Sequence, residues 1–217
     1  MESLERHEDY GQELLDESHL LSDPIEQFKL WLKEAEQSNI YEPNAFVLGT
    51  VDSENHPRSR TVLLKGVGPE GFFFASNYLS RKGEALDANP HVSCVFGWYS
   101  IYRQVLIQGV AHKVSAEESD DYFNSRPRES RVAAWSSHQS QPIESRTALD
   151  AQFQSALERF PGEAVPRPAH WGGYLIVPSR IEFWKGRSNR MHDRIEFSRT
   201  VSDSGEVSDW QVQRLQP

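Results

Sequence analysis

Residues 91–98 read HVSCVFGW and residues 103–114 read RQVLIQGVAHKV, and these two runs decide the fold class. Both are rich in the β-branched and aromatic residues that favour strands. The second run is long, and its Gly109 predicts a bend, because a glycine inside a strand commonly marks a bulge. The two runs therefore place β-sheet at the centre of the protein.

Strand patterns continue on both sides of this pair. NAFVLGTVD (44–52) and SRTVLLKG (59–66) flank a turn-forming segment, which predicts a hairpin. The other predicted strands are GFFFAS (71–76), GYLIV (173–177), RIEFWKG (180–186), HDRIEFSR (192–199) and VSDWQVQR (207–214). About eight strands in near-meander order, with helices at the edges, predict a mainly β, α+β fold in which an antiparallel barrel closes on itself and so protects its edges.

One helix start is especially clear. Asp23 is a suitable N-cap, Pro24 suits the first helical position, and Glu26 completes the pattern of a capping box. Apolar residues follow at helical spacing and predict one buried face: Ile25, Phe28, Trp31, Leu32 and Ala35.

Three more helices are predicted at 80–88, from the capping box Ser115/Glu118 to about residue 124, and at 145–160. Residues 161–170 form a proline-rich connector. Residues 1–22 lack apolar periodicity, so we expect a mobile acidic segment there and a single domain over 23–217.

The charge of the chain is unevenly distributed. The 217 residues carry a formal net charge of −9. Residues 1–42 hold 12 acids and 3 bases, whereas residues 43–217 hold 20 of each. A neutral body without a basic stripe disfavours nucleic-acid binding, and its local basic clusters favour small anions. No apolar run approaches the ~18 residues that a membrane span needs, so we expect no membrane association.

Several other classes of site are disfavoured. Cys94 is the single cysteine and lies in an apolar run, which predicts a core residue and no disulfide within the chain. The acidic, polar N-terminus resembles no targeting signal, so we expect a cytoplasmic protein. The histidines have no metal-binding spacing, so we expect no metal site. No GxxxxGK[ST] or GxSxG motif is present, and we expect the reactivity to come from a cofactor that cationic and amide groups hold.

The strongest basic cluster is YFNSRPRESRVAAWSSHQS, residues 122–140. It places Arg126, Arg128 and Arg131 among serines and Gln139, with Pro127 stiffening the backbone. Guanidinium forks pair well with the oxygens of a phosphate. The cluster therefore predicts a phosphate site, and the alternative is a solvated basic loop.

Two further basic clusters occur earlier in the chain. Strand alternation predicts that Arg60, Val62 and Leu64 face one side of their strand, and that Thr61, Leu63 and Lys65 face the other. Cations on both faces favour two anions, and the alternative is a solvent-facing edge strand. Ser80-Arg81-Lys82 begins a predicted helix, where backbone amides attract phosphate. The amide of Gln104 can hydrogen-bond the edge of a heterocycle.

The last cluster is EFWKGRSNRMHDR, residues 182–194. If this segment is extended, Arg190, His192 and Arg194 share one face near Trp184. Such a group predicts an aromatic, anionic ligand, and the alternative is an ion network around Asp193. The ordinary pKa of histidine would suit His192 to a general base, and the alternative is a structural histidine.

Taken together, these motifs resemble the pyridoxamine/pyridoxine 5′-phosphate oxidase family, from about residue 23 to residue 217. The matching motifs occur in one order: RTVLLK (60–65), SRK (80–82), RQV (103–105), SRPRES (125–130), AWSSHQS (134–140), WGG (171–173), EFWKG (182–186), RMHDR (190–194) and the closing W-x-x-x-R-L-x-P (210–217).

The resemblance implies an FMN-binding split barrel that forms a homodimer, with two FMN sites built from both subunits. It implies that pyridoxamine or pyridoxine 5′-phosphate gives up a hydride to FMN and that dioxygen is the final acceptor, with pyridoxal 5′-phosphate and hydrogen peroxide as products. The FMN-binding residues that it implies are Arg60, Thr61, Val62, Leu63, Leu64, Lys65, Ala75, Ser76, Arg81, Lys82, Gln104, Gln139, Ser140, Trp184 and Arg194. The substrate-binding residues that it implies are Lys65, Tyr122, Arg126, Ser130, Arg190, Met191 and His192, with Arg190 and His192 as the catalytic pair.

The chain departs from the family pattern at two places. Ala75 stands where many relatives carry Tyr, and the N-terminal segment, basic in relatives, is acidic here, with His7 in the place of an Arg. Two alternative functions follow. One is an FMN oxidase of the related phenazine-biosynthesis type, and the other is a non-catalytic module that binds flavin or pyridoxal phosphate.

Overall fold

The computed structural model describes residues 9–202 and 207–217. The helices in chain order are η1 (Glu17–His19), α2 (Pro24–Gln37), α3 (Arg81–Ala88), η2 (Tyr99–Ile101), α4 (Ala116–Ser125), α5 (Arg128–Ser136), α6 (Arg146–Arg159) and η3 (Ser188–Arg190). The strands are β1 (Ala45–Val51), β2 (Pro57–Leu63), β3 (Gly66–Gly68), β4 (Gly71–Asn77), β5 (His91–Trp98), β6 (Arg103–Lys113), β7 (Trp171–Lys185), β8 (Asp193–Ser198) and β9 (Gln211–Leu215).

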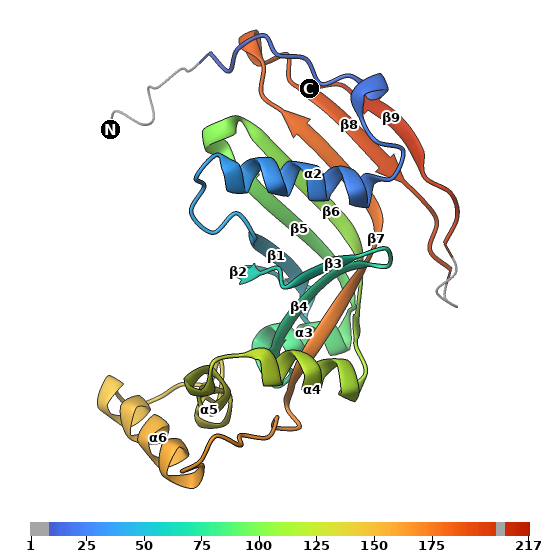
Figure 1. Cartoon of the computed structure of the whole chain (residues 1–217). Coiled ribbons are helices and arrows are strands. Elements are labelled where there is room, and N and C mark those ends of the chain that lie inside the picture. Colours follow the sequence, from blue (N-terminus) through green and yellow to red (C-terminus); the bar gives the residue numbers. More distant parts are fainter. Residues whose placement is uncertain (1–8, 203–206) are drawn as a thin grey trace.

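All nine of these strands form one antiparallel sheet that curls on itself (Figure 1). The main path is β2-β1-β5-β6-β7-β4-β3. Only Leu64 and Lys65 separate β2 from β3, which lie at opposite ends of this path. The sheet must therefore curl until its two ends meet, and the Lys65 N–H donates to Phe73 O of β4 at 2.8 Å.

The long strand β7 explains why the barrel is split. Its first half pairs with β4 and its second half pairs with β8, while β6 pairs with both halves. The register of β6 on β7 shifts between Gln108 and Gly109. A Cβ on Gly109 would lie 2.2 Å from Val177 O, so only glycine allows this close approach. The bulge lets the two halves of the sheet diverge, and the predicted bend at Gly109 is confirmed.

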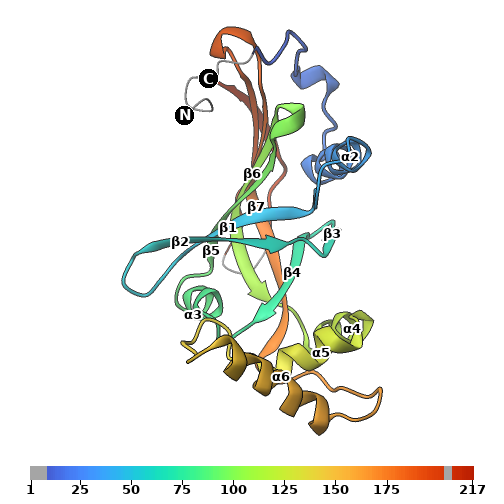
Figure 2. The same cartoon turned by 90° about the vertical axis from the view of Figure 1, so that its left-hand side faces the viewer.

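Aromatic side chains fill the concave face of the sheet. Helix α2 covers this face, and its Phe28 ring lies 4.9 Å from Phe72 and 4.8 Å from Phe96. Trp31, one turn further on, lies 5.1 Å from Phe183 of β7. Helices α3 to α6 gather at the end of the barrel away from both termini (Figures 1 and 2). The buried face of α2 and the α+β split barrel are confirmed.

Several details of the prediction are wrong. The order is no near-meander, because β4 pairs with β7 across 94 or more residues of chain. Residues 173–177 and 180–186 belong to one strand, β7. Residues 128–136 form helix α5, which the sequence analysis did not anticipate. At the start of α2, Asp23 caps the Ile25 N–H at 2.8 Å, while Glu26 pairs with Lys29 at 2.6 Å.

The part of the acidic N-terminal segment that the structure describes lies along the C-terminal strands. Leu15 is buried, and its N–H donates to Asp193 at 3.0 Å. Arg214 of β9 binds Glu17 through two hydrogen bonds of 2.9 and 2.7 Å. Glu13 pairs with the buried Lys185. Residues 1–8, including His7, lie outside the described residues. Within the described ranges, no helix has the length and apolar character needed to cross a membrane.

Candidate functional site

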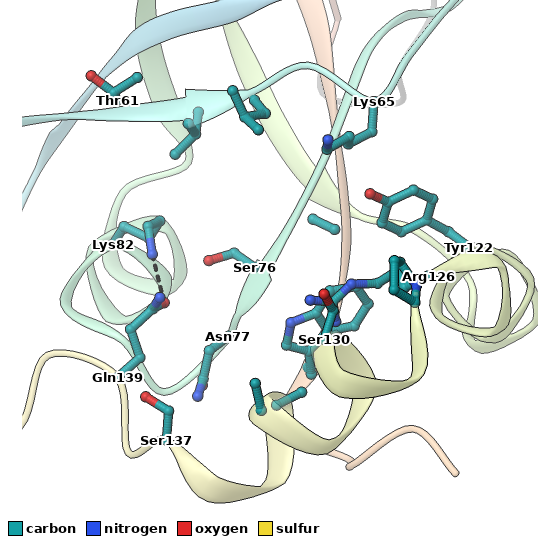
Figure 3. A pocket seen from close by; sticks show the side chains of 17 residues that line it. Thr61, Lys65, Ser76, Asn77, Lys82, Tyr122, Arg126, Ser130, Ser137 and Gln139 are labelled. Atoms are coloured by element: carbon teal, nitrogen blue, oxygen red, sulfur yellow. Dashed lines mark hydrogen bonds between the residues drawn. The ribbon is translucent and has the colours of Figure 1, made fainter. Parts of the chain in front are cut away.

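A cavity of about 560 Å³ opens between the sheet and the helices at the end of the barrel (Figure 3). Strand β2 and the residues after it supply one wall, β4 the floor, and α4 and α5 the opposite wall. The predicted site residues that line it are Thr61, Val62, Leu63, Lys65, Ala75, Ser76, Lys82, Tyr122, Arg126, Ser130 and Gln139. Residues that are far apart in the sequence, from Thr61 to Gln139, therefore line one cavity, as the basic clusters predicted.

The cavity has a one-sided charge. Lys65, Lys82 and Arg126 line it, and no aspartate or glutamate is among its lining residues. Cations without a carboxylate partner leave their donors available to an anion. The lining is therefore chemically suited to a ligand with phosphate or carboxylate groups.

Arg126 anchors one end of the cavity, where helix α4 ends and Pro127 begins the turn into α5. Its guanidinium lies 4.4 Å from the centroid of the Trp171 ring. Its Nη1 atom is buried without a hydrogen-bond partner among the described residues, and burial lowers the pKa of Arg126. A buried donor of this kind is costly unless a ligand satisfies it.

Three neighbours complete this end of the cavity. Tyr122 of α4 stacks on Trp171, with a centroid distance of 6.1 Å and an interplanar angle of 8°, and burial raises the Tyr122 pKa. Ser130 lies in the first turn of α5, whose N-cap is Pro127 and has no side-chain capping bond. The uncapped amides of this turn and the Ser130 hydroxyl favour an anion. Figure 3 shows Lys65 on the same side as Tyr122 and Arg126.

Lys82 and Gln139 form the opposite end, as Figure 3 shows. Lys82 Nζ donates to Gln139 Oε1 at 2.8 Å and to Ser80 Oγ at 3.2 Å. Burial, with a smaller contribution from Arg60, lowers the pKa of Lys82 to about 8. Beside them, the Arg81 N–H donates to Ser140 Oγ at 3.3 Å, which ties the start of α3 to the loop after α5.

A second group of predicted residues lies outside the cavity, on neighbouring strands. Gln104 of β6 pairs with Trp184 of β7, which pairs with Arg194 of β8. Arg194 donates two hydrogen bonds to Glu182, at 2.7 and 2.9 Å. We call Gln104, Trp184, Arg190, Met191, His192 and Arg194 the tail cluster. None of its members lines the cavity of the same chain.

Residues 182–194 do not form one extended segment. The predicted common face of Arg190, His192 and Arg194 therefore does not form. Residues 188–190 make a 3₁₀ turn, and Asn189 and Arg190 have φ values of 57° and 60°. Two consecutive non-glycine residues with positive φ cost energy and occur mainly at functional sites. An ion network around Asp193 does form, but its cations are Arg214, at 2.6 Å, and Arg187, at 3.8 Å, rather than Arg190 or Arg194.

Three predicted residues have other roles in the structure. Arg60 does not line the cavity, and its Nη1 donates to Leu48 O at 2.9 Å. Strand β2 ends at Leu63, so the predicted alternation of faces does not extend to Leu64, which is buried in the core. Arg128 holds the end of α6 through Phe160 O and Gly162 O. Of the three arginines in the predicted phosphate cluster, only Arg126 lines the cavity.

Seven residues of these two groups were not among the predicted cofactor-binding or substrate-binding residues. Glu182 positions Arg194, and the other six line the cavity: Asn77, Pro127, Ala133, Ala134, Ser137 and Trp171. Trp171 begins the WGG motif and Glu182 begins EFWKG, so both lay within motifs that had been noticed. Since Glu182 and Trp184 are two residues apart on one strand, alternation already placed them on one face.

The curled antiparallel sheet with helices at one end defines the chain as a split-barrel protein. The crystal structure of PhzG from Burkholderia lata 383, in complex with tetrahydrophenazine-1-carboxylic acid, superposes with a TM-score of 0.87 at 30% identity and covers 96% of this chain and all of that one. A pyridoxamine 5′-phosphate oxidase-related, FMN binding protein from Nostoc punctiforme shares the fold, with a TM-score of 0.70 at 15% identity.

Sequence comparison narrows the class. Residues 32–159 match the family Pyridoxamine 5′-phosphate oxidase, and residues 171–217 match the Pyridoxine 5′-phosphate oxidase C-terminal dimerisation region. A pyridoxine/pyridoxamine 5′-phosphate oxidase from Burkholderia lata is 48% identical over 96% of this chain and 95% of its own length. One from Paraburkholderia phytofirmans is 47% identical over 98% of each. The chain belongs to the pyridoxine/pyridoxamine 5′-phosphate oxidase family.

Proposed function

We propose that the protein is an FMN-dependent oxidase that converts pyridoxamine or pyridoxine 5′-phosphate to pyridoxal 5′-phosphate, with dioxygen as acceptor. The observation that carries this proposal is the cavity with cations at both ends and no carboxylate in its lining. FMN and the substrate are both phosphorylated aromatics, so two cationic ends suit two phosphates. Family membership at 47–48% identity to the curated oxidases supports the same substrate class.

The residues of the cavity fit FMN. Its volume of about 560 Å³ lies in the range of small-molecule sites. Lys82, Gln139 and Ser76 would hold the flavin at one end, and the strand residues Thr61 to Leu63 would lie along it. When bound, FMN supplies the acceptor for a hydride from the substrate's C4′ atom and passes the electrons to dioxygen, which gives hydrogen peroxide.

The side chains at the Arg126 end position the substrate. Arg126, Lys65 and Ser130 would bind its phosphate through charge-assisted hydrogen bonds, which fix the position of the attached ring. The stacked rings of Tyr122 and Trp171 form an apolar wall beside this phosphate site and exclude water from it. The lining residues include neither a carboxylate nor a histidine, so we assign no such group of this cavity a role in proton transfer.

The active unit that we propose is a homodimer in which the tail cluster of one chain completes the cavity of the other. Within one chain, strand pairing aligns Thr61, Val47, Val95, Leu106 and Glu182 in a row on the outer face of the sheet. Thr61 lines the cavity and Glu182 holds Arg194, so the row joins the two groups. Thr61 and Glu182 are four strand spacings of ~4.8 Å apart, which is roughly 19 Å.

The three inner residues of this row, Val47, Val95 and Leu106, are apolar. Val47, on the strand next to β2, is 42% exposed, and Val95 and Leu106 are half-buried. An isologous contact across this face would place each cavity against the tail cluster of the second chain. The match of residues 171–217 to a dimerisation region supports this arrangement.

Absorption spectroscopy tests the activity directly. FMN-loaded protein should lose its flavin absorption band when pyridoxamine 5′-phosphate is added without oxygen, and should regain the band when oxygen is admitted. With oxygen present, pyridoxal 5′-phosphate and hydrogen peroxide should form in equal amounts. A flavin-loaded protein that neither phosphorylated substrate bleaches would refute the proposed reaction and would favour a non-catalytic binder.

The pH dependence of FMN binding tests the role of Lys82. Because the Lys82 pKa is about 8, the side chain is charged below pH 8 and neutral above it. Affinity of the apoprotein for FMN should therefore fall about tenfold from pH 7 to pH 9, as one cation is lost. Fluorescence titration measures this change. Riboflavin, which has no phosphate, is the control ligand and should show a much smaller change.

The matched variant is Lys82→Met, which has no charge to lose. Its FMN affinity should be lower at pH 7 and nearly constant up to pH 9. An equally steep decline in this variant would show that another group causes the pH dependence.

The phenazine-type alternative has weaker support. PhzG shares 30% identity with this chain, against 48% for the oxidase from the same species, Burkholderia lata. Ala75, which lines the cavity, leaves room that a larger ligand could use. The orphaned Nη1 of Arg126, however, favours a substrate that carries its own phosphate.

A further inference from the structure

Arg194 is held by a buried carboxylate on the neighbouring strand. Its Nε and Nη2 atoms donate to the two oxygens of Glu182 at 2.7 and 2.9 Å, and its Nη1 donates to Gln216 O at 3.1 Å. Glu182 is only 8% exposed. These contacts use three of the five N–H groups of the guanidinium, and the other two have no protein acceptor among the described residues. The guanidinium is therefore fixed in orientation while part of it stays available to a ligand.

A second buried carboxylate lies directly opposite the first. Glu196 of β8 is the register partner of Glu182 and is also 8% exposed. It accepts from Gln213 at 2.9 Å and from the half-exposed Arg180 at 3.3 and 3.4 Å. Like charges that face each other on neighbouring strands are destabilising. A neutral glutamine at position 182 could accept a hydrogen bond from Arg194 without this cost, so orientation alone does not account for the carboxylate.

The charge of Glu182 has a second consequence, because it cancels that of Arg194. The hydrogen bonds from Arg194 to Glu182 raise the pKa of Arg194, so the guanidinium stays protonated. A lone cation beside a flavin favours the reduced flavin, which holds two more electrons, and so raises the reduction potential. A carboxylate bound to that cation opposes the effect, because its field has the opposite sign.

We propose that Glu182 is a positioning residue that also sets the reduction potential of bound FMN, because it neutralises Arg194 where the tail cluster meets the cavity of the second chain. This inference rests on the proposed function, since it needs FMN in the shared site. A lower potential makes reduced FMN a stronger reductant for dioxygen. Glu196, whose cation is the half-exposed Arg180, has a much smaller effect on the potential.

Spectroelectrochemical titration at saturating FMN tests the proposal without turnover. Glu182→Gln removes the charge and keeps a hydrogen-bond acceptor. It should favour reduced over oxidised FMN about tenfold, which raises the two-electron potential by about 30 mV. Arg194→Gln leaves Glu182 uncompensated and should lower the potential by a similar amount. In the double variant Glu182→Gln/Arg194→Gln the pair is neutral again, so the ratio should return to within about twofold of wild type.

Glu196→Gln is the matched control. It removes a buried carboxylate from the same pair of strands, but one that accepts no hydrogen bond from Arg194, so the ratio should change less than about twofold. A Glu182→Gln potential at or below the wild-type value would overturn the proposal. So would a double variant well below wild type, because Arg194 would then act on the flavin without compensation. The double variant contains no unpaired buried charge, so it keeps the test decisive if a single variant does not fold.

The outcomes also separate this inference from the proposed function. An active oxidase in which Arg194→Gln shifts the potential and Glu182→Gln does not would defeat this inference alone. Shifts of the expected signs in a protein that oxidises neither phosphorylated substrate would defeat the proposed reaction and leave the role of Glu182 standing. If none of the variants shifts the potential, Arg194 does not lie beside the flavin, and both this inference and the shared site are wrong.

Discussion

Replacing Arg126 with alanine is expected to raise KM for pyridoxamine 5′-phosphate by roughly 100-fold or more. Two charge-assisted hydrogen bonds to a phosphate contribute about 3–4 kcal/mol together, and each 1.4 kcal/mol corresponds to a factor of ten. The buried, unpartnered Nη1 and the absence of carboxylates from the lining leave this guanidinium free for the ligand. Steady-state kinetics over a wide substrate range measure the effect, and kcat should change much less than KM.

Arg131→Ala is the matched control. Arg131 comes from the same basic cluster, and its Nε is also buried without a partner among the described residues, but Arg131 does not line the cavity, so its removal should leave KM nearly unchanged. Unphosphorylated pyridoxine is the control substrate, since it has no phosphate for Arg126 to bind. If Arg126→Ala changes KM by less than threefold, the phosphate site has been placed wrongly, and a substrate without phosphate becomes the better hypothesis.

Local signals in the sequence predicted the elements well, because capping and alternation act over a few residues. The Ser115/Glu118 capping box forms as expected, and Gly109 marks the bulge. The order of strands was wrong because β4 pairs with a strand nearly a hundred residues away, and no local pattern specifies that partner. Helix α5 was missed because its first turn follows Pro127 and contains Ser130, residues that also occur in loops.

The candidate site was predictable by residue type and less so by geometry. Lys65 and Arg126 line the cavity, as cations suited to phosphate should. Strand alternation placed Leu64 beside Arg60, but β2 ends before Leu64, which enters the core. The residue patterns alone did not predict the separation of the tail cluster from the cavity, because it depends on the curl of the whole sheet; only the family resemblance implied sites built from two subunits. That separation is the reason for proposing that a second chain completes the site.

The most direct measurement is recovery of activity from two inactive chains. One carries Arg126→Ala, which damages the cavity. The other carries Arg190→Ala with His192→Leu, which damages the tail cluster and leaves the Glu182–Arg194 pair intact. Each should be nearly inactive alone at substrate concentrations near the wild-type KM.

After subunit exchange, half of the dimers should contain one chain of each kind. In such a dimer, one site carries the substitutions of both chains and the other site carries none. One intact site of two, in half of the dimers, should restore activity to about a quarter of the wild-type value. The control mixture pairs Arg126→Ala with Lys65→Ala, two lesions of the cavity, and should recover nothing. If the first mixture shows only the sum of its two residual activities while exchange is complete, each site is built within a single chain, and the shared site proposed for the dimer is contradicted.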